Sequence, residues 1–262
     1  MKKVCVLINP DKSKAKKIAE NITLFLKKKK VEILGLDKVK RADFLIVVGG
    51  DGMILRAAQI VNSKIPVLAI AAGTLGFLSS MTSSQFKEKF HQIKRGKFSI
   101  ENRMMLSAEV GKLKFKALND FVVERKTHRG IELEVKIDNE ELATYLGDGL
   151  IIATPTGSTA YSFAAGGPVV NPLISCLILT PVSAHTLMNR SFVLPDNESV
   201  KIFPRDDCFL TIDGQEKISV CKGVPITIKK APFAFKLIKF SEEKFYNAVK
   251  SKLMVPKPYV YK

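Results

Sequence analysis

The sequence predicts an α/β domain followed by a β-rich domain, and three observations carry this prediction. Short, fully apolar runs at residues 4–8, 44–48 and 66–72 alternate with helical patterns over the first hundred positions. Strands that are apolar on both faces indicate a parallel sheet covered by helices on both sides. Beyond residue 104, apolar and polar residues alternate, as they do in strands with one face in a core. At 262 residues the chain is long enough for two modest domains.

Each apolar run of the first part is followed by apolar residues at helical spacing. The positions that mark these helices are Ile18, Ile22, Phe25, residues 53–61, Phe86, Phe90 and Ile93. Lysines 27–30 fit the exposed end of the first helix, where cations complement the helix dipole. We therefore expect three strand–helix repeats before the pattern changes.

The second part reads as strands joined by turns. Residues 131–137 alternate, residues 138–140 form a turn, and alternation resumes at residues 142–146. Further β-like runs lie at residues 177–180, 200–203, 209–212 and 224–238.

The tail returns to helical spacing at residues 241–253, with Ser241 as the expected N-cap and Glu242 and Glu243 in the first turn. We expect this helix to pack on the first domain. The predicted domains are therefore an α/β domain at 1–99 plus about 239–262, and a β-rich domain at 100–238.

The net charge of +17 suggests nucleic acid as a partner, but its composition argues against that interpretation. Only eight of the 42 basic residues are Arg, the residue favoured for bidentate recognition of phosphate and guanine. Basic residues outnumber acidic ones threefold in residues 1–40, whereas residues 151–200 contain a single basic residue, Arg190. A lysine-rich exterior that attracts anionic small molecules explains the charge better.

No apolar run reaches the length of a membrane-spanning helix, and the N-terminus lacks the features of a secretory signal. Cys5, Cys176, Cys208 and Cys221 show no CxxC spacing, so neither a disulfide framework nor a zinc site is indicated. We expect reduced, mostly buried thiols in a cytoplasmic protein that spans no membrane.

The first chemical motif is VVGGDG, at the carboxyl end of the 44–48 strand. Gly49, Gly50 and Gly52 would let the backbone approach a phosphate and adopt positive φ. Asp51 is unexpected there, because a carboxylate repels phosphate unless it binds a cation or accepts a proton from a substrate hydroxyl. A tight turn merely shaped by Asp51 is the structural alternative.

The second motif runs from Gly147 through TPTGSTAY to Pro168. Its hydroxyls and freed amides could bind phosphate or ribose, and Tyr161 offers a face for a base. An ordinary Ser/Thr/Gly turn, with Tyr161 in a core, is the alternative interpretation.

Together the motifs resemble the NAD kinase family. They are GGDG with Leu55-Arg56, GTLGFL at 73–78, ALND at 117–120, the GDGLIIATPTGSTAYSFAAGGP stretch and DGQ at 213–215, in the family's order. GGDG alone is also similar to diacylglycerol-type lipid kinases and phosphofructokinases, but TPTGSTAY does not belong to those enzymes.

The resemblance implies a doubly wound, Rossmann-like N-terminal domain and a β-sandwich-like C-terminal domain. It implies transfer of the terminal phosphoryl group of ATP, or of polyphosphate, to the adenosine ribose 2′-hydroxyl of NAD, giving NADP. Mg²⁺ or another divalent metal would neutralise the phosphates. It also implies a homodimer or homotetramer, with NAD and ATP as partners. The composition of the basic residues, as argued above, predicts no nucleic acid among the partners.

The resemblance further implies roles for individual residues. Asp51 takes the proton from the 2′-hydroxyl, while Gly52 and Arg56 lie beside the phosphates. Phe77 closes the pocket by stacking. The NAD-binding positions of the β-rich domain are Asn119, Asp120, Asp148, Thr159, Ala160, Tyr161, Ser162, Ala164 and Gln215.

Four positions depart from the family pattern. Met53 stands where Thr is usual, Ala71 where Asn is frequent, Leu146 where some members carry Arg, and Asp120 where Glu is commoner. None of these departures alters Asp51 or TPTGSTAY, so we still expect activity. They leave open which phosphoryl donor is used and how tightly the substrates bind. A diacylglycerol-type lipid kinase and a non-catalytic basic protein that binds nucleotides or nucleic acid are the alternatives.

Overall fold

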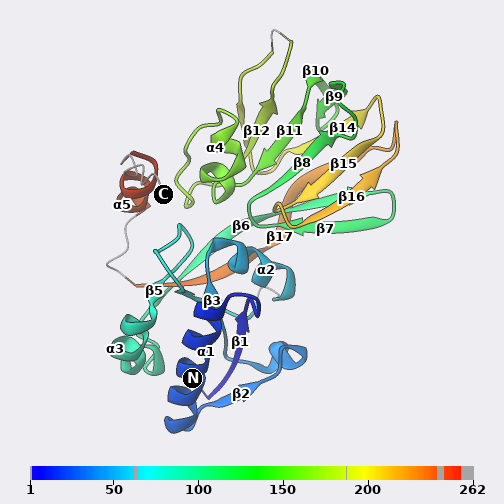
Figure 1. The fold of residues 1–262 in the computed structure, drawn as a ribbon. Coiled ribbons are helices and arrows are strands. Elements are labelled where there is room, and N and C mark those ends of the chain that lie inside the picture. Colours follow the sequence, from blue (N-terminus) through cyan, green and yellow to red (C-terminus); the bar gives the residue numbers. More distant parts are fainter. Residues whose placement is uncertain (1, 62–63, 187, 241–244, 255–262) are drawn as a thin grey trace. The chain divides into compact units, whose positions relative to one another are not determined.

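The computed structural model describes residues 2–61, 64–186, 188–240 and 245–254. The chain divides into two compact units (Figure 1), one formed by residues 1–102 with 236–262 and one by residues 103–235. Two segments that are distant in sequence therefore build the first unit. The domain boundaries given above remain a prediction, since a division by contacts does not show which segments fold alone.

The first unit contains a parallel sheet with the strand order β2-β1-β3-β4. Its elements are β1 (Lys3–Ile8), α1 (Ser13–Lys28), β2 (Glu32–Leu34), η1 (Leu36–Arg41), β3 (Phe44–Gly49), α2 (Asp51–Ile60), β4 (Val67–Ala71), β5 (Met81–Thr82), α3 (Ser83–Lys94), α5 (Phe245–Val249) and η3 (Lys250–Met254). This order, with a helix after most strands, confirms the predicted α/β fold.

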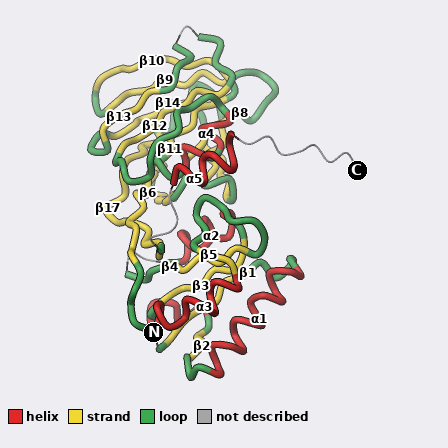
Figure 2. Tube along the Cα trace, turned by 90° about the vertical axis from the view of Figure 1, so that its left-hand side faces the viewer, coloured by secondary structure: helices red, strands yellow, loops and turns green. Residues whose placement is uncertain are grey.

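Burial explains why these apolar runs become central strands. All residues of β3 and β4 are buried, as expected when both faces of a parallel sheet are covered. The apolar faces of α1 and α3 meet one face of the sheet, where Phe25 of α1 packs edge-on against Phe90 of α3 with ring centroids 5.1 Å apart. Helices and strands of this unit can be followed in Figure 2.

The C-terminal part of the chain completes the first unit. Strand β17 (Ile226–Lys239) ends beside β4, with Leu237 paired to Val67. The carbonyl of Ile238 accepts a hydrogen bond from the Ser80 hydroxyl at 2.5 Å. Of the predicted tail helix, the structure contains α5 and η3, while the proposed cap Ser241 and the acidic residues 242–243 lie outside the described residues.

The second unit consists of two layers of strands, as the sandwich prediction requires. Its elements are β6 (Ser99–Val110), β7 (Leu113–Ala117), β8 (Asp120–Arg125), β9 (Ile131–Ile137), β10 (Glu140–Gly147), β11 (Gly149–Ala153), η2 (Gly157–Thr159), α4 (Tyr161–Ala164), β12 (Cys176–Val182), β13 (Phe192–Pro195), β14 (Ser199–Pro204), β15 (Cys208–Ile212), β16 (Glu216–Val220) and the first part of β17. One layer has the order β10-β9-β14-β17 and the other β13-β12-β11-β8-β15-β16.

A single apolar core lies between these layers. Val135 and Ile202 from one layer join Phe121, Leu150 and Leu210 from the other in one buried cluster. The alternation read along residues 131–137 places its apolar positions in this core and its polar positions outside.

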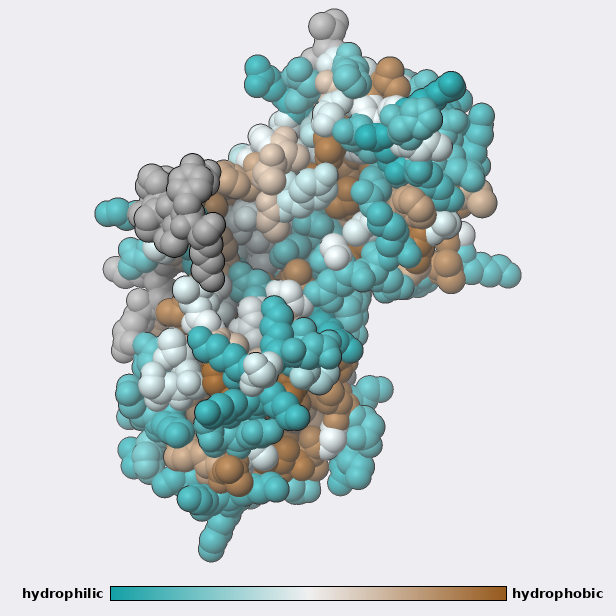
Figure 3. Space-filling view, viewed as in Figure 1, coloured by the Kyte–Doolittle hydropathy of each residue, from teal (hydrophilic) through white to brown (hydrophobic). Residues whose placement is uncertain are grey.

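Lysines and other polar residues occupy the exterior. Lys27 to Lys30 are exposed at the end of α1, and hydrophilic residues dominate the face shown in Figure 3. Cys5, Cys176 and Cys208 are buried free thiols, and Cys221 is exposed. Among the described residues, every helix is too short or too polar to cross a bilayer.

Candidate functional site

Asp51 is the first residue of α2 and is held by a loop from elsewhere in the first unit. One of its carboxylate oxygens accepts the N–H of Phe77 at 2.8 Å, and the other accepts the N–H of Leu78 at 3.2 Å. These bonds fix the carboxylate at the amino end of the helix, where the dipole also favours negative charge. The carboxylate of Asp51 thus has a defined position just after the end of β3.

Gly76 makes this close approach possible. A Cβ atom on Gly76 would lie 1.9 Å from an Asp51 carboxylate oxygen, so any other residue would force the two apart. The Gly76 N–H donates to the Ser79 hydroxyl at 3.1 Å, and the Ser79 carbonyl accepts from the buried Lys239 amine at 3.0 Å. The loop that holds Asp51 is therefore itself fixed within the first unit.

The glycines of GGDG do not have the backbone conformation that was expected of them. The prediction of positive φ is wrong, since Gly49, Gly50 and Gly52 all lie outside that region and Gly50 has φ −96°. Gly49 instead makes room for Met53, whose Cγ would lie 2.7 Å from an added Cβ. Gly50 is the N-cap of α2 and is open on the side where a Cβ would be.

The remaining predicted residues of the first unit border the amino end of α2. Gly52 and Arg56 are exposed one helical turn apart on α2. Phe77 is half-buried, and its backbone binds Asp51. The structure thus brings Asp51 and Phe77 into contact.

In the second unit, Asp213 organises the segment that contains Asn119 and Asp120. Its carboxylate accepts the N–H groups of Leu118 at 3.0 Å, Asn119 at 2.7 Å and Asp120 at 3.3 Å. Asp213 and Gly214 both have positive φ, in the turn between β15 and β16. Gln215 is exposed in that turn, where its N–H donates to Ile212.

Asp120 is a buried acid whose pKa is raised well above its usual value. The residue is 4% exposed. Burial, and next the negative charge of Asp213, raise the pKa of Asp120 from 3.8 to about 7. The carboxyl group is therefore poised to change charge near neutral pH.

The hydroxyls of the TPTGSTAY stretch are largely used by the protein itself. The Thr154 hydroxyl donates to the Leu118 carbonyl at 2.6 Å, and the Ser158 hydroxyl donates to the Pro155 carbonyl at 2.7 Å. The predicted ligand residue Ser162 is fully buried and bonded to Thr180 at 2.9 Å. Gly157 is required because its Cβ would lie 2.2 Å from the Asn119 carbonyl oxygen.

Four residues from the end of this stretch and from α4 are accessible. Thr159 and Ala160 are half-buried, and Ala164 is exposed on the short helix α4. Tyr161 is 45% exposed. Ligand contact from this stretch would accordingly come from Tyr161, from small side chains and from backbone groups.

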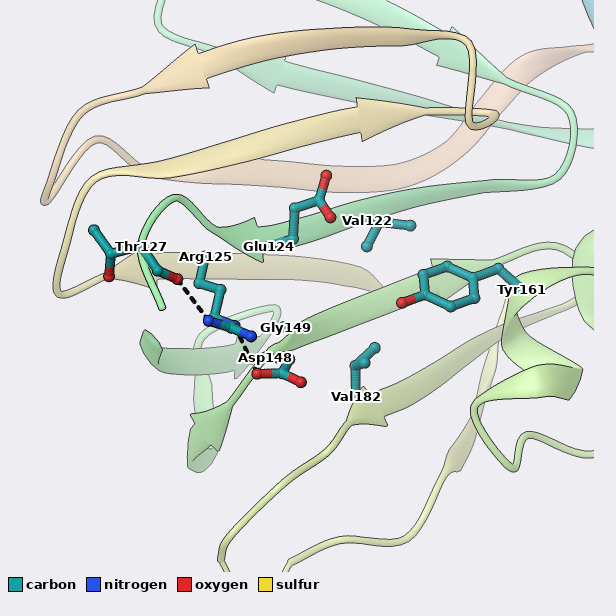
Figure 4. A pocket seen from close by; sticks show the side chains of 8 residues that line it. All are labelled: Val122, Glu124, Arg125, Thr127, Asp148, Gly149, Tyr161 and Val182. Atoms are coloured by element: carbon teal, nitrogen blue, oxygen red, sulfur yellow. Dashed lines mark hydrogen bonds and ion pairs between the residues drawn. The ribbon is translucent and has the colours of Figure 1, made fainter. Parts of the chain in front are cut away.

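Tyr161 and Asp148 both line an open pocket of about 280 Å³. Figure 4 shows Tyr161 at one end and an ion pair at the other, in which the Arg125 Nε lies 2.6 Å from the Asp148 Oδ1. The residues that line the pocket are Val122, Glu124, Arg125, Thr127, Asp148, Gly149, Tyr161 and Val182. Burial first, and then the charges of Glu124, Asp148 and Asp120, raise the pKa of Tyr161.

Sequence reasoning missed several residues that shape these places. Arg125 and Glu124 follow the ALND motif on β8, where nothing in the pattern marks them as pocket residues. Asp213 belongs to a recognised motif, and its Asp-Gly dipeptide signals a turn, but the hydrogen bonds to a distant loop carry no sequence signal. Within the described part of the chain, His, Cys, Asp and Glu form no group of three or more that could hold a metal ion.

We predict that Gly76→Ala destabilises the protein by about 1–3 kcal/mol, because the added methyl group overlaps the Asp51 carboxylate. Gly73→Ala is the matched control, since nothing lies within 4 Å of its Cβ position. Urea unfolding of the two variants measures the difference. Equal stability of both variants would contradict the described packing.

We predict that Asp120→Asn gains stability over the wild type as the pH rises. The folded pKa of Asp120, about 7, lies above the reference value of 3.8, so the wild-type folded state holds the extra proton between these values. Wild-type stability therefore falls from about pH 4 to pH 7, by ~2–4 kcal/mol from this group. Urea unfolding at pH 5 and pH 8 should show a larger advantage of the variant at pH 8. If the difference in stability between Asp120→Asn and the wild type were the same at both pH values, the raised pKa of Asp120 would be refuted.

Family models cover most of this chain. A model described as the ATP-NAD kinase N-terminal domain matches residues 36–98, and one described as the ATP-NAD kinase C-terminal domain matches residues 118–240. The NAD kinase of Fusobacterium nucleatum is 35% identical, with 97% of each chain covered. The NAD kinase of Clostridium perfringens strain 13 is 36% identical, covering 97% of this chain and 99% of the relative.

Two solved structures share the fold of this chain. An NAD kinase from Archaeoglobus fulgidus in complex with ATP superimposes with a TM-score of 0.82 at 28% identity, covering 96% of this chain and 98% of that one. Yeast NADH kinase complexed with NADH shares the fold, with a TM-score of 0.90 at 23% identity and coverage of 100% and 90%. These matches favour neither a lipid kinase nor a non-catalytic basic protein. The chain belongs to the ATP-NAD kinase family of enzymes.

Proposed function

We propose that this protein phosphorylates NAD, with Asp51 as the general base. The adenosine ribose 2′-oxygen attacks the terminal phosphorus of ATP, the bond to the leaving ADP breaks, and the hydroxyl proton passes to Asp51. In phosphoryl transfer the protein mainly positions the reactants and stabilises charge. One well-placed carboxylate is therefore enough to accept the proton of the attacking hydroxyl.

The observation that carries this proposal is the geometry of Asp51. Two backbone N–H groups hold its carboxylate at the amino end of α2, a place that otherwise favours an anionic ligand. A carboxylate fixed beside a phosphate-binding helix end can receive a proton from a hydroxyl that attacks the phosphate. Gly52 and the exposed Arg56 lie on the same helix and would contact the phosphates.

ATP is the donor we favour, because the Archaeoglobus relative was solved with ATP. Polyphosphate remains the alternative donor. Both oxygens of Asp51 already accept N–H bonds, and the described residues do not form a metal cage. Mg²⁺, or another divalent metal, would therefore be bound mainly by the donor's phosphates.

Residues of the second unit would recognise the dinucleotide. Tyr161 offers an exposed ring for stacking, and Asp148 lies in the same pocket. Asn119 and Asp120 are held by Asp213 and would meet ribose hydroxyls. Thr159, Ala160, Ala164 and Gln215 complete the proposed NAD site, and the buried Ser162 would support them through its bond to Thr180. Phe77 would stack on the substrate.

We further propose a cytoplasmic homodimer or homotetramer that needs neither nucleic acid nor a membrane. Four large apolar side chains are exposed in the short segment that follows Tyr161 in the sequence. They are Phe163, Val169, Leu173 and Ile174. Several exposed apolar side chains within one segment are consistent with a protein interface.

We predict that Asp51→Asn retains NAD binding but lowers kcat by about 10²–10⁴-fold, because the amide cannot accept the proton. A coupled assay with purified protein, Mg²⁺, ATP and NAD measures NADP formation, and calorimetry measures NAD binding. Asp37→Asn, an exposed acid of the same unit, is the control and should keep full activity. Near-normal turnover by Asp51→Asn would refute the general-base role.

The same assay decides the reaction itself. Wild-type protein that forms no NADP with ATP or polyphosphate would refute the proposed function. Phosphate incorporation into diacylglycerol would instead identify a lipid kinase. Strong, salt-dependent DNA retention without kinase activity would favour the nucleic-acid-binding alternative.

We predict that the double substitution of Leu173→Asp and Ile174→Asp dissociates the oligomer, because charges on the exposed apolar segment cannot be buried in an interface. Light scattering coupled to size exclusion measures the mass. Leu24→Asp is the control, because Leu24 is similarly exposed, at 58%, on α1. A variant of unchanged mass would remove this segment from the interface.

A further inference from the structure

The loop that binds Asp51 is held by two lysines from the C-terminal part of the chain. Lys239, at the end of β17, is buried and donates to the Ser79 carbonyl at 3.0 Å. Lys252, on η3, donates to the Leu75 carbonyl. The two amines thus bind the loop on either side of Gly76, whose position allows Asp51 to approach.

Lys252 makes a second contact with the same loop. Its Nζ lies over the ring of Phe77, 4.9 Å from the centroid, in a cation–π arrangement. Phe77 is also the residue whose N–H donates to Asp51 at 2.8 Å. One ammonium group therefore contacts the backbone of Leu75 and the side chain of Phe77, two residues apart.

The position of these contacts matters for the Asp51 carboxylate. Gly73, Thr74 and Leu75 are exposed, so this half of the loop has little packing of its own. Leu78, Ser79 and Ser80 are buried, and Lys239 and Ile238 hold that half. Lys252 is thus a contact from outside the loop to its exposed half, whereas the buried half is held by packing as well.

We infer that Lys252 is a positioning residue for the phosphoryl transfer: it fixes residues 75–77, and through the Phe77 N–H it fixes Asp51. The inference rests on the role of Asp51 proposed above. Lys252 need not touch either substrate. Its ammonium group lies over the Phe77 ring, beside the backbone that binds Asp51.

Three substitutions of Lys252 separate its contacts. Lys252→Met removes the charge and the donor while keeping a long apolar side chain. Lys252→Gln keeps a donor for the Leu75 carbonyl without the charge that attracts the ring. Lys252→Arg keeps both, since guanidinium also binds aromatic faces. Lys250→Met, an exposed lysine on the same element, is the matched control.

Two measurements are made on each variant. Hydrogen exchange at the amides of Phe77 and Leu78 reports whether the loop still holds Asp51, and it does not depend on activity. Steady-state kinetics separates kcat from KM for NAD. We expect Lys252→Met to exchange faster at both amides and to lose about 5- to 10-fold in kcat, with KM within about twofold, because a small misplacement of a catalytic group slows the chemical step.

Lys252→Arg should restore both properties, Lys252→Gln should be intermediate, and Lys250→Met should match the wild type. Unchanged exchange and kcat in Lys252→Met would overturn the inference. Equal losses in Lys252→Met and Lys250→Met would also overturn it, because they would show a general effect of charge. If the wild type forms no NADP, the proposed function fails, and the exchange experiment alone decides whether Lys252 fixes the loop.

Discussion

The contact between the Asp51 carboxylate and two backbone N–H groups is the constraint on which the first unit's site depends. It joins the amino end of α2 to a loop that follows the next strand, and it tolerates no side chain at Gly76. An aspartate side chain without these bonds would sample several rotamers. Restricting it to one rotamer when a substrate binds would then cost conformational entropy. Here the orientation is set before any substrate arrives.

The second unit uses the same physical device. The Asp213 carboxylate gathers three successive N–H groups of residues 118–120, so that a loop without regular structure gains a fixed shape. Burial raises the pKa of the neighbouring Asp120, and the negative charge of Asp213 raises it further. In both units a carboxylate orders the backbone, and the side chains beside it become available for ligands.

Local pattern was enough to predict the fold but not these contacts. The apolar runs that became β3 and β4, and the alternation that became β9, follow from burial over a few neighbouring residues. The family's motifs pointed to Asp51 and Tyr161. By contrast, the bond from Asp213 to Asn119 joins residues 94 positions apart, and Ser162 turned out to be bonded to Thr180. Residue type alone could not reveal whether a hydroxyl faces a ligand or the protein interior, nor that Arg125 would reach Asp148.

The first unit is built from two segments that are far apart in the sequence, so the ribosome makes them at different times. Residues 1–102 leave the ribosome well before Leu237, Ile238 and Lys239, which complete the edge of β4 and bind the loop at Ser79 and Ser80. Although α/β units often fold as soon as they emerge, this one stays incomplete until the intervening 133 residues of the second unit, Arg103–Phe235, have been made. The nascent chain thus carries Asp51 before Ile238 and Lys239, the residues that bind its loop at Ser80 and Ser79, have been made.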